Sequence, residues 1–98
     1  MTKYKYNVEF SSSFKKNLKK ITKQGKDIDK MLDIIDKLAE KEQLEPKHKD
    51  HNLINDKYFE DCRECHIEPD WLLIYKYIDD KLILLLMKTG SHSELFKK

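Results

Sequence analysis

The sequence has few of the residues and segments that mark several common protein classes. Its 98 residues include only two Gly and two Pro, so no Pro/Gly-rich linker divides the chain, and no repeat or low-complexity segment occurs. The longest apolar run, Leu82–Met87, has six residues, against the roughly 20 that a membrane-spanning helix needs. We therefore predict a single domain over residues 1–98 that does not enter a membrane.

The N-terminal segment also lacks the features of a secretion signal. Residues 4–10 alternate apolar and polar side chains, a period of two that is typical of a strand and not of a signal peptide. We therefore expect a cytoplasmic protein. Since thiols in the cytoplasm are normally kept reduced, Cys62 and Cys65 are not expected to form a structural disulfide.

Acidic residues are scarce in one N-terminal segment, and basic residues are scarce in the segment that follows it. Residues 1–26 hold eight Lys and one acid, whereas residues 27–46 hold seven acids and three Lys. Such asymmetry is typical of a surface that faces a polyanion beside a solvated acidic surface. The candidate RNA-phosphate contacts are Lys15, Lys16, Lys19 and Lys20. The alternative is that these lysines form only the solvated side of a helix.

Periodicity along the chain predicts an α+β fold with the order β-α-α-β-β-β. Helical spacing predicts one helix over residues 11–24, ended by Gly25, and a second one that begins at Asp27. Strands are predicted over residues 58–67, 71–78 and 82–89, followed by a short helical turn capped by Ser91. A twisted antiparallel sheet with the N-terminal helical hairpin on one face accounts for this order. The expected core positions of the second helix are Ile28, Met31, Leu32, Ile35, Leu38 and Ala39.

The segment from Leu44 to Lys57 fits neither helical nor strand periodicity. So long an irregular stretch in a small domain is more often a functional loop than a simple connection. It contains two of the four histidines, His48 and His51.

The stretch CRECH at residues 62–66 has the spacing of a haem-attachment motif, and its cysteine pair also suggests zinc. In a strand, however, Cys62 and Cys65 are three residues apart and point to opposite faces of the sheet. No second cysteine pair completes the four ligands of a structural zinc site. We expect no metal or haem here, and interpret the cysteines as small strand residues.

The stretch HIEPDW, which begins at His66, contains acid–base groups that topology should bring near a fourth histidine. Pro69 interrupts the strand pattern, so His66 and Asp70 should lie at a sheet-edge turn. If the last two strands form a hairpin, His92 returns toward the same edge. Imidazoles can donate or accept protons near neutral pH, which suits RNA cleavage by a ribose 2′-hydroxyl.

Three segments resemble those of a known family: KDHNL (49–53), CHIEPDWLLIYK (65–76) and KTGSHSELF (88–96). They resemble the signature segments of YafQ-like toxins, in the RelE superfamily of bacterial type II toxin–antitoxin systems. The element order agrees with a RelE-like fold, so the resemblance covers nearly the whole chain. It implies a ribosome-dependent endoribonuclease that cuts mRNA without metal or cofactor. Its implied partners are the ribosome, mRNA and a cognate antitoxin, with operator DNA bound only through the antitoxin complex.

The resemblance also implies functional positions, which fall on His51, His66, Asp70, Trp71, His92 and Phe96. In our hypothesis His92 is the general acid, and the other two histidines and Asp70 supply the base and stabilise charge. The two aromatic residues would hold nucleotides. The alternative is that Trp71 is a core residue at a strand start and that Phe96 fixes the C-terminus. His48 lies outside the matching motif and is expected to be a loop residue.

Two departures from the family pattern leave the charge-stabilising residue open. Relatives usually carry an aromatic residue in the strand before HIEPDW, where this chain has Cys62 beside Arg63, its only arginine. Lysine cannot make the two-pronged phosphate contact of arginine, so the charge would rest on Lys, protonated His, or Arg63 if it faces the site. The alternatives to an enzyme are a ParE-like toxin that binds DNA gyrase, or an inactive relative that serves only in the antitoxin complex.

Overall fold

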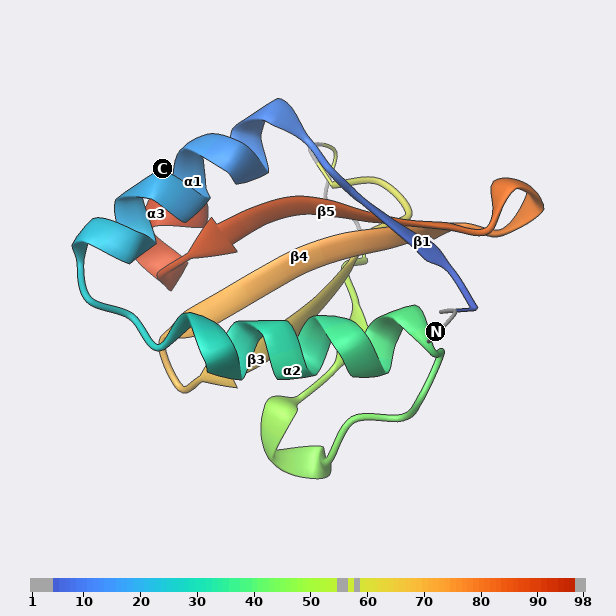
Figure 1. The fold of residues 1–98 in the computed structure, drawn as a ribbon, viewed down its shortest axis with the longest axis horizontal. Helices are drawn as coiled ribbons and strands as arrows, with labels where there is room; N and C mark the ends of the chain where they lie inside the picture. The colour runs from blue at the N-terminus through green and yellow to red at the C-terminus, as the bar shows by residue number, and fades with distance from the viewer. Residues whose placement is uncertain (1–4, 55–56, 58, 97–98) are drawn as a thin grey trace.

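The computed structural model describes residues 5–54, 57 and 59–96. The predicted strand residues Tyr4 and Tyr58 and the predicted loop residues Asn55 and Asp56 lie outside this range. In chain order the elements are β1 Asn7–Phe10, α1 Ser12–Lys23, α2 Ile28–Ala39, η1 Pro46–His48, β2 His51–Asn52, β3 Arg63–Glu68, β4 Trp71–Ile78, η2 Asp79–Lys81, β5 Ile83–Gly90 and α3 His92–Leu95 (Figure 1). Within the described ranges, no helix is long and apolar enough to cross a membrane.

The five strands form one sheet in the order β1-β5-β4-β3-β2. The α+β class is confirmed, but the sheet is mixed, because β1 runs parallel to β5 while the other pairs are antiparallel. The predicted antiparallel pairing therefore holds for β2 to β5 and differs only at β1. Alternation of side chains reports which face of a strand is buried and carries no information on the direction of its neighbour.

The predicted strand over residues 58–67 is shorter in the structure and begins at Arg63. Asp61 has a left-handed backbone with φ of 60°, and the N–H of Cys62 donates to the carbonyl of Phe59 at 3.1 Å. This closes a turn that a strand cannot contain. The loop predicted from Leu44 onward is likewise partly ordered into η1 and β2.

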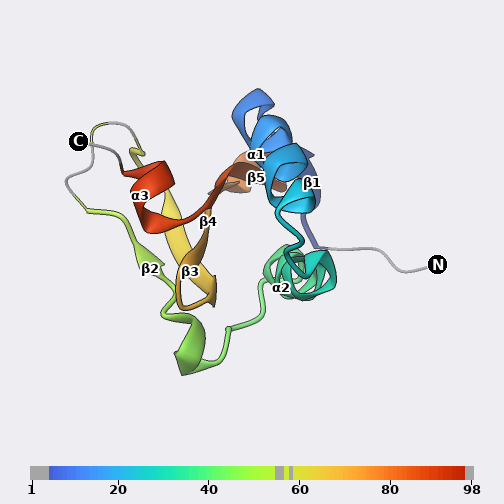
Figure 2. The same ribbon diagram turned by 90° about the vertical axis from the view of Figure 1, so that its left-hand side faces the viewer.

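Both N-terminal helices cover the same face of the sheet, as predicted (Figure 2). Helix α1 begins at a capped end, where the Oγ of Ser11 accepts from the N–H of Phe14 at 3.0 Å. The shared core contains Phe14 and Ile21 of α1, Met31, Ile34, Ile35 and Leu38 of α2, and Cys65, Leu73, Tyr75, Leu84 and Leu86 of the sheet. Leu32 was expected in this core, but it is 47% exposed.

The opposite face of the sheet carries a smaller apolar cluster and helix α3 (Figure 2). Ile74 of β4 packs there with Phe59 and Cys62, and Leu95 and Phe96 cover them. Since Cys65 belongs to the helix-side core, the two cysteines lie on opposite faces as predicted. We call this second face the α3 face, because it carries α3 and the histidines described next.

Candidate active site

Two histidines of the α3 face meet at one buried carboxylate. The register of β2 and β3 places His51 opposite Glu64, and His66 lies two residues further along β3, on the same face. The Nε2 atoms of His51 and His66 lie 3.5 and 3.8 Å from the same oxygen, Oε1 of Glu64. The Glu64 side chain is only 5% exposed. A charge so deeply buried is stabilised when a neighbour carries the opposite charge, so either imidazole is placed to balance the Glu64 carboxylate when the imidazole carries a proton.

The two imidazole rings are oriented by backbone carbonyls. Nδ1 of His51 lies 2.6 Å from the carbonyl oxygen of Lys49, and Nδ1 of His66 lies 3.2 Å from that of Pro69. Because a carbonyl oxygen only accepts, each Nδ1 must carry the hydrogen and donate. Both rings therefore present Nε2 toward Glu64.

Glu64 is a candidate functional residue that the sequence patterns did not single out. The available signal was the spacing Glu-x-His inside a predicted strand, which puts Glu64 and His66 on one face. That spacing alone suggested no role for the carboxylate. Its burial came from the pairing with β2, a strand that the sequence does not reveal.

Asp70 positions the short helix that carries His92. Oδ1 of Asp70 accepts from the backbone N–H of His92 at 3.1 Å. Ser91 and Glu94 complete a reciprocal capping box at the same helix start. The His92 side chain is exposed and packs against the Phe96 ring, with centroids 5.2 Å apart.

The strand register brings the His66 and His92 segments to one edge of the sheet. His66 pairs with Leu72 of β4, and Leu72 pairs with Gly90 of β5. Two interstrand steps span about 10 Å, and His92 follows two residues after Gly90. This agrees with the expectation that topology brings the two histidines toward each other.

Trp71 does not present its ring to a nucleotide in this structure. It is fully buried in the helix-side core, and its Nε1 donates to Oγ1 of Thr89 at 2.9 Å. That hydroxyl in turn donates to the carbonyl of Leu72 at 2.7 Å. The prediction that Trp71 stacks on a base is therefore wrong, and the side chain instead ties the start of β4 to the end of β5.

Phe96 is half-buried on the α3 face. Its ring contacts Phe59 edge-to-face at 5.8 Å between centroids and lies beside His92. Phe96 thus anchors the end of α3, and the residue is partly exposed. Its stacking on a nucleotide stays a prediction.

The four candidate lysines lie on α1, which packs on the helix side of the sheet and not on the α3 face. Lys15, Lys16 and Lys19 are exposed. Lys20 is also exposed, but its Nζ lies 2.6 Å from Oε2 of Glu94. A phosphate contact by these lysines stays a prediction, and it would involve RNA beyond the scissile bond.

Glu94 joins α1 to α3, and the Lys20 ammonium and the Ser91 N–H lower the pKa of its carboxyl to about 2 from 4.5. A depressed carboxyl pKa contributes stability above the unfolded value, and this contribution is lost as pH falls through the folded one. We expect Glu94→Gln to lower Tm near neutral pH by about 2–4 °C, because an exposed pair contributes about 0.5 kcal/mol. The difference from wild type should shrink between pH 4.5 and about 2 in calorimetry. An equal difference at both ends of this range would contradict the assignment.

Gly90 is the position where β5 turns into α3. Its φ is 155°, and an added Cβ would lie 3.0 Å from Oε1 of Glu94, an oxygen that already accepts from the Ser91 N–H at 2.8 Å. Gly90→Ala should therefore displace α3, lower stability by about 1–3 kcal/mol and reduce activity. Gly25→Ala is the matched control, because Gly25 has a positive φ but no atom within 4 Å of the added Cβ. Loss of stability with full activity in Gly90→Ala would contradict the coupling to α3.

Arg63 lies on the helix side of β3, away from the imidazoles. Its Nη2 pairs with Oδ2 of Asp50 at 3.1 Å, its Nη1 donates to Oδ1 of Asn52 at 2.7 Å, and its Nε donates to the Tyr75 hydroxyl at 3.3 Å. Arg63 therefore does not face the histidines of the α3 face.

Among the described residues, no three His, Cys, Asp or Glu side chains are arranged to hold a metal ion.

A family model for a bacterial toxin of a type II toxin–antitoxin system, YafQ, matches residues 6–97. The chain belongs to the YafQ family. The resemblance of its three sequence segments to this family is thereby confirmed. Among curated relatives, the mRNA interferase toxin YafQ of Escherichia coli strain B / BL21-DE3 is 37% identical over 91 residues, which cover 92% of this chain and 95% of that protein.

Solved structures of similar proteins share the fold. A metal-bound toxin from Helicobacter pylori is 41% identical with a TM-score of 0.86, and the match covers 93% of this chain and 99% of that one. The toxin in the E. coli DinJ–YafQ complex is 35% identical with a TM-score of 0.81, over 93% of this chain and 98% of that one. These matches confirm the predicted α+β fold of the YafQ family.

Proposed function

We propose that this YafQ-family toxin is an endoribonuclease that cleaves mRNA on the ribosome by metal-independent acid–base catalysis. One observation carries the proposal: two imidazoles share a buried carboxylate on the face to which topology returns a third, exposed histidine. The match to E. coli mRNA interferase toxins supports mRNA as the substrate.

The first chemical step removes a proton from the ribose 2′-hydroxyl as its oxygen attacks the adjacent phosphorus. We assign the role of general base, which accepts this proton, to His51. Its side chain is 50% exposed, whereas that of His66 is 16% exposed. Glu64 balances the positive charge that His51 acquires. His66, held against the same carboxylate, stabilises the negative charge on the phosphorane when it is protonated.

The second step returns a proton to the 5′-oxygen as it leaves. His92 is the donor in this scheme, because its ring is exposed at the start of α3 while its backbone is fixed by Asp70. Asp70 is thus a positioning residue and not the base. Atom balance gives a 2′,3′-cyclic phosphate on one product and a 5′-hydroxyl on the other.

The decisive experiment compares purified protein on free mRNA and on mRNA programmed into ribosomes. We expect cleavage within codons on the ribosome and at least about 10²-fold slower cleavage of free RNA, because the ribosome would hold the scissile dinucleotide in line. Equal cleavage of both substrates would contradict ribosome dependence. DNA damage with intact mRNA in expressing cells would instead favour a gyrase-directed toxin.

Metal removal should leave the reaction unchanged. In the proposed mechanism, imidazoles accept the proton of the 2′-hydroxyl and donate the proton to the 5′-oxygen. Cleavage rates with EDTA and with added Mg²⁺ or Cu²⁺ should therefore agree within about twofold, provided that the ribosomes stay intact. Because EDTA removes the Mg²⁺ that ribosomes need, only the toxin is dialysed against EDTA, before it is mixed with ribosomes that retain their Mg²⁺. A lost activity that a transition metal restores would overturn metal independence.

The partner that restrains the toxin is proposed to be a cognate antitoxin. Solved toxin–antitoxin complexes of the similar E. coli protein support this. Operator DNA would then be contacted only through the antitoxin complex, and the site of action would be the cytoplasm, where translating ribosomes are found. Co-expression with an antitoxin encoded beside the gene should abolish mRNA cleavage.

A further inference from the structure

The segment that carries His51 is fixed from the opposite side of the sheet. β2 has only two residues, His51 and Asn52, and so short an edge strand provides few ladder hydrogen bonds to hold a side chain in place. Three side chains flank it on the helix side, and none of them faces the imidazoles: Asp50, Arg63 and Tyr75.

Arg63 uses its planar guanidinium to hold both neighbours of His51. It pairs with Asp50 on one side and donates to Asn52 on the other, at 3.1 and 2.7 Å. The Tyr75 hydroxyl donates to the second carboxylate oxygen, Oδ1 of Asp50. Burial and the hydrogen bond with Asp50 raise the pKa of Tyr75, which keeps the phenol protonated as a donor. The backbone before and after His51 is therefore fixed while its ring is left free to face Glu64.

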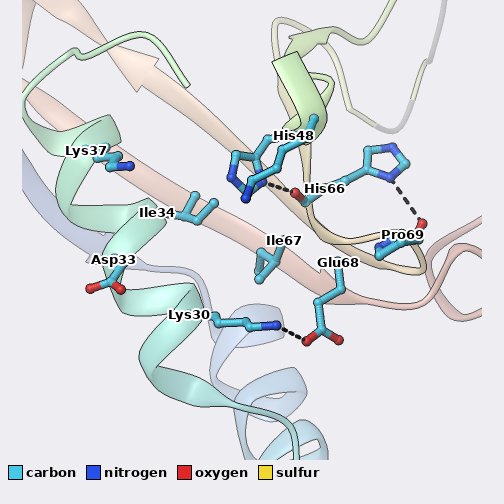
Figure 3. Close-up of a pocket in the computed structure, with 10 residues that line it drawn as sticks. Lys30, Asp33, Ile34, Lys37, His48, His66, Ile67, Glu68 and Pro69 are labelled. Atoms are coloured by element: carbon cyan, nitrogen blue, oxygen red, sulfur yellow. Dashed lines mark hydrogen bonds and ion pairs between the residues drawn. The ribbon is translucent and has the colours of Figure 1, made fainter. Parts of the chain in front are cut away.

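The same segment has a second anchor at its other end. Nδ1 of the half-buried His48 lies 2.7 Å from the carbonyl oxygen of His66 and must donate to it (Figure 3). Lys49, which follows, has a left-handed backbone with φ of 47° and supplies the carbonyl that orients His51. His48 is thus more than a loop residue, because it ties η1 to the strand of the second imidazole. Figure 3 shows the His66 ring directed away from the adjoining pocket, which α2 and η1 line.

We propose that Arg63, through Asp50 and Asn52, is a positioning residue for His51 and does not contact the RNA. The inference rests on the proposed function for its kinetic consequence, but the orientation of His51 can be measured without activity. The only arginine of the chain, which by its chemistry would be expected at a phosphate, instead holds the base in place.

The test replaces Arg63 with Lys, which keeps the charge but cannot bond to Asp50, Asn52 and Tyr75 at once. We expect kcat to fall about 10–10²-fold with KM within about twofold of wild type, because a small misplacement of a catalytic group is costly. If Arg63 contacted a phosphate, Arg63→Lys would instead raise KM, because Lys cannot reproduce the two-pronged contact of Arg. Asp50→Asn should give the same kcat-selective loss, and it replaces Arg63→Lys if that variant does not fold.

A double-mutant cycle separates positioning from a purely structural role. In a His51→Ala background, Arg63→Lys should change the remaining rate by less than about twofold, since the group that it positions is already gone. An undiminished loss in that background would overturn the proposal. Asp80→Asn is the control for the negative charge lost in Asp50→Asn, because Asp80 is exposed in η2, beyond the end of β4.

The ring nitrogens of His51 give a readout that does not depend on catalysis. ¹⁵N NMR of selectively labelled protein should show a shifted His51 Nδ1 resonance in Arg63→Lys, as the bond to the Lys49 carbonyl loosens. Unchanged His51 resonances would overturn the inference whether or not the wild type cleaves mRNA. If the wild type does not cleave mRNA but Arg63→Lys still shifts the His51 resonance, the positioning role is supported and only the proposed function is overturned.

Discussion

Replacing Glu64 with Gln should lower the single-turnover rate of mRNA cleavage by about 10²-fold or more. Gln keeps the volume of the side chain but removes the charge that the two imidazoles share. Without that charge, a proton on His51 or His66 is no longer stabilised by a carboxylate whose side chain is 5% exposed. The effect should appear mainly in kcat, because Glu64 is too buried to contact the RNA.

Glu68→Gln is the matched control for this loss. Glu68 belongs to the same strand, but a register shift between His66 and Glu68 turns its side chain toward Lys30 of α2, at 3.0 Å. Quench-flow cleavage on programmed ribosomes should give a near wild-type rate for Glu68→Gln and a much slower one for Glu64→Gln. Similar rates in both variants would remove Glu64 from the proposed active site.

Replacing His92 with Ala should lower the cleavage rate by about 10²–10⁴-fold, the usual range for a lost general acid or base. The leaving 5′-oxygen would then depart without a proton. The fold should be little affected, because the His92 side chain is exposed and the hydrogen bond to Asp70 uses its backbone N–H.

A substrate with a 5′-bridging sulfur distinguishes the general-acid role from other roles of His92. Thiolate is a good leaving group and needs no proton, so His92→Ala should cleave this mRNA at nearly the wild-type rate. His51→Ala should remain slow on it, because the 2′-hydroxyl still has to lose its proton. An equally large defect of His92→Ala on both substrates would exclude His92 as the acid.

The elements were largely predictable because their signals are local. Helix α2 was predicted to begin at Asp27, and the structure has its first residue at Ile28 with Asp27 before it. Strand β4 has the predicted bounds, and the Ser91 cap on α3 was also predicted. Each of these follows from side-chain periodicity or a capping residue within a few positions.

The parts that failed depend on pairing between distant segments. The direction of β1, the existence of β2 and the burial of Trp71 are set by which strands become neighbours. The same holds for Glu64, whose role emerges only when β2 places His51 opposite it. Arg63 shows the limit most clearly, since its residue type suggests a phosphate contact and its position on β3 gives it another task.

The chemical identity of the RNA ends tests the central claim most directly. If imidazoles catalyse attack of the 2′-hydroxyl on the phosphorus, mass spectrometry of fragments from programmed ribosomes should find 2′,3′-cyclic phosphates, or their 2′- and 3′-phosphate hydrolysis products, at the 3′ end of the upstream fragment. The downstream fragment should begin with a 5′-hydroxyl. Fragments with 3′-hydroxyl and 5′-phosphate ends would mean that water, and not the ribose, is the nucleophile. That result would contradict the proposed roles of His51, Glu64 and His92.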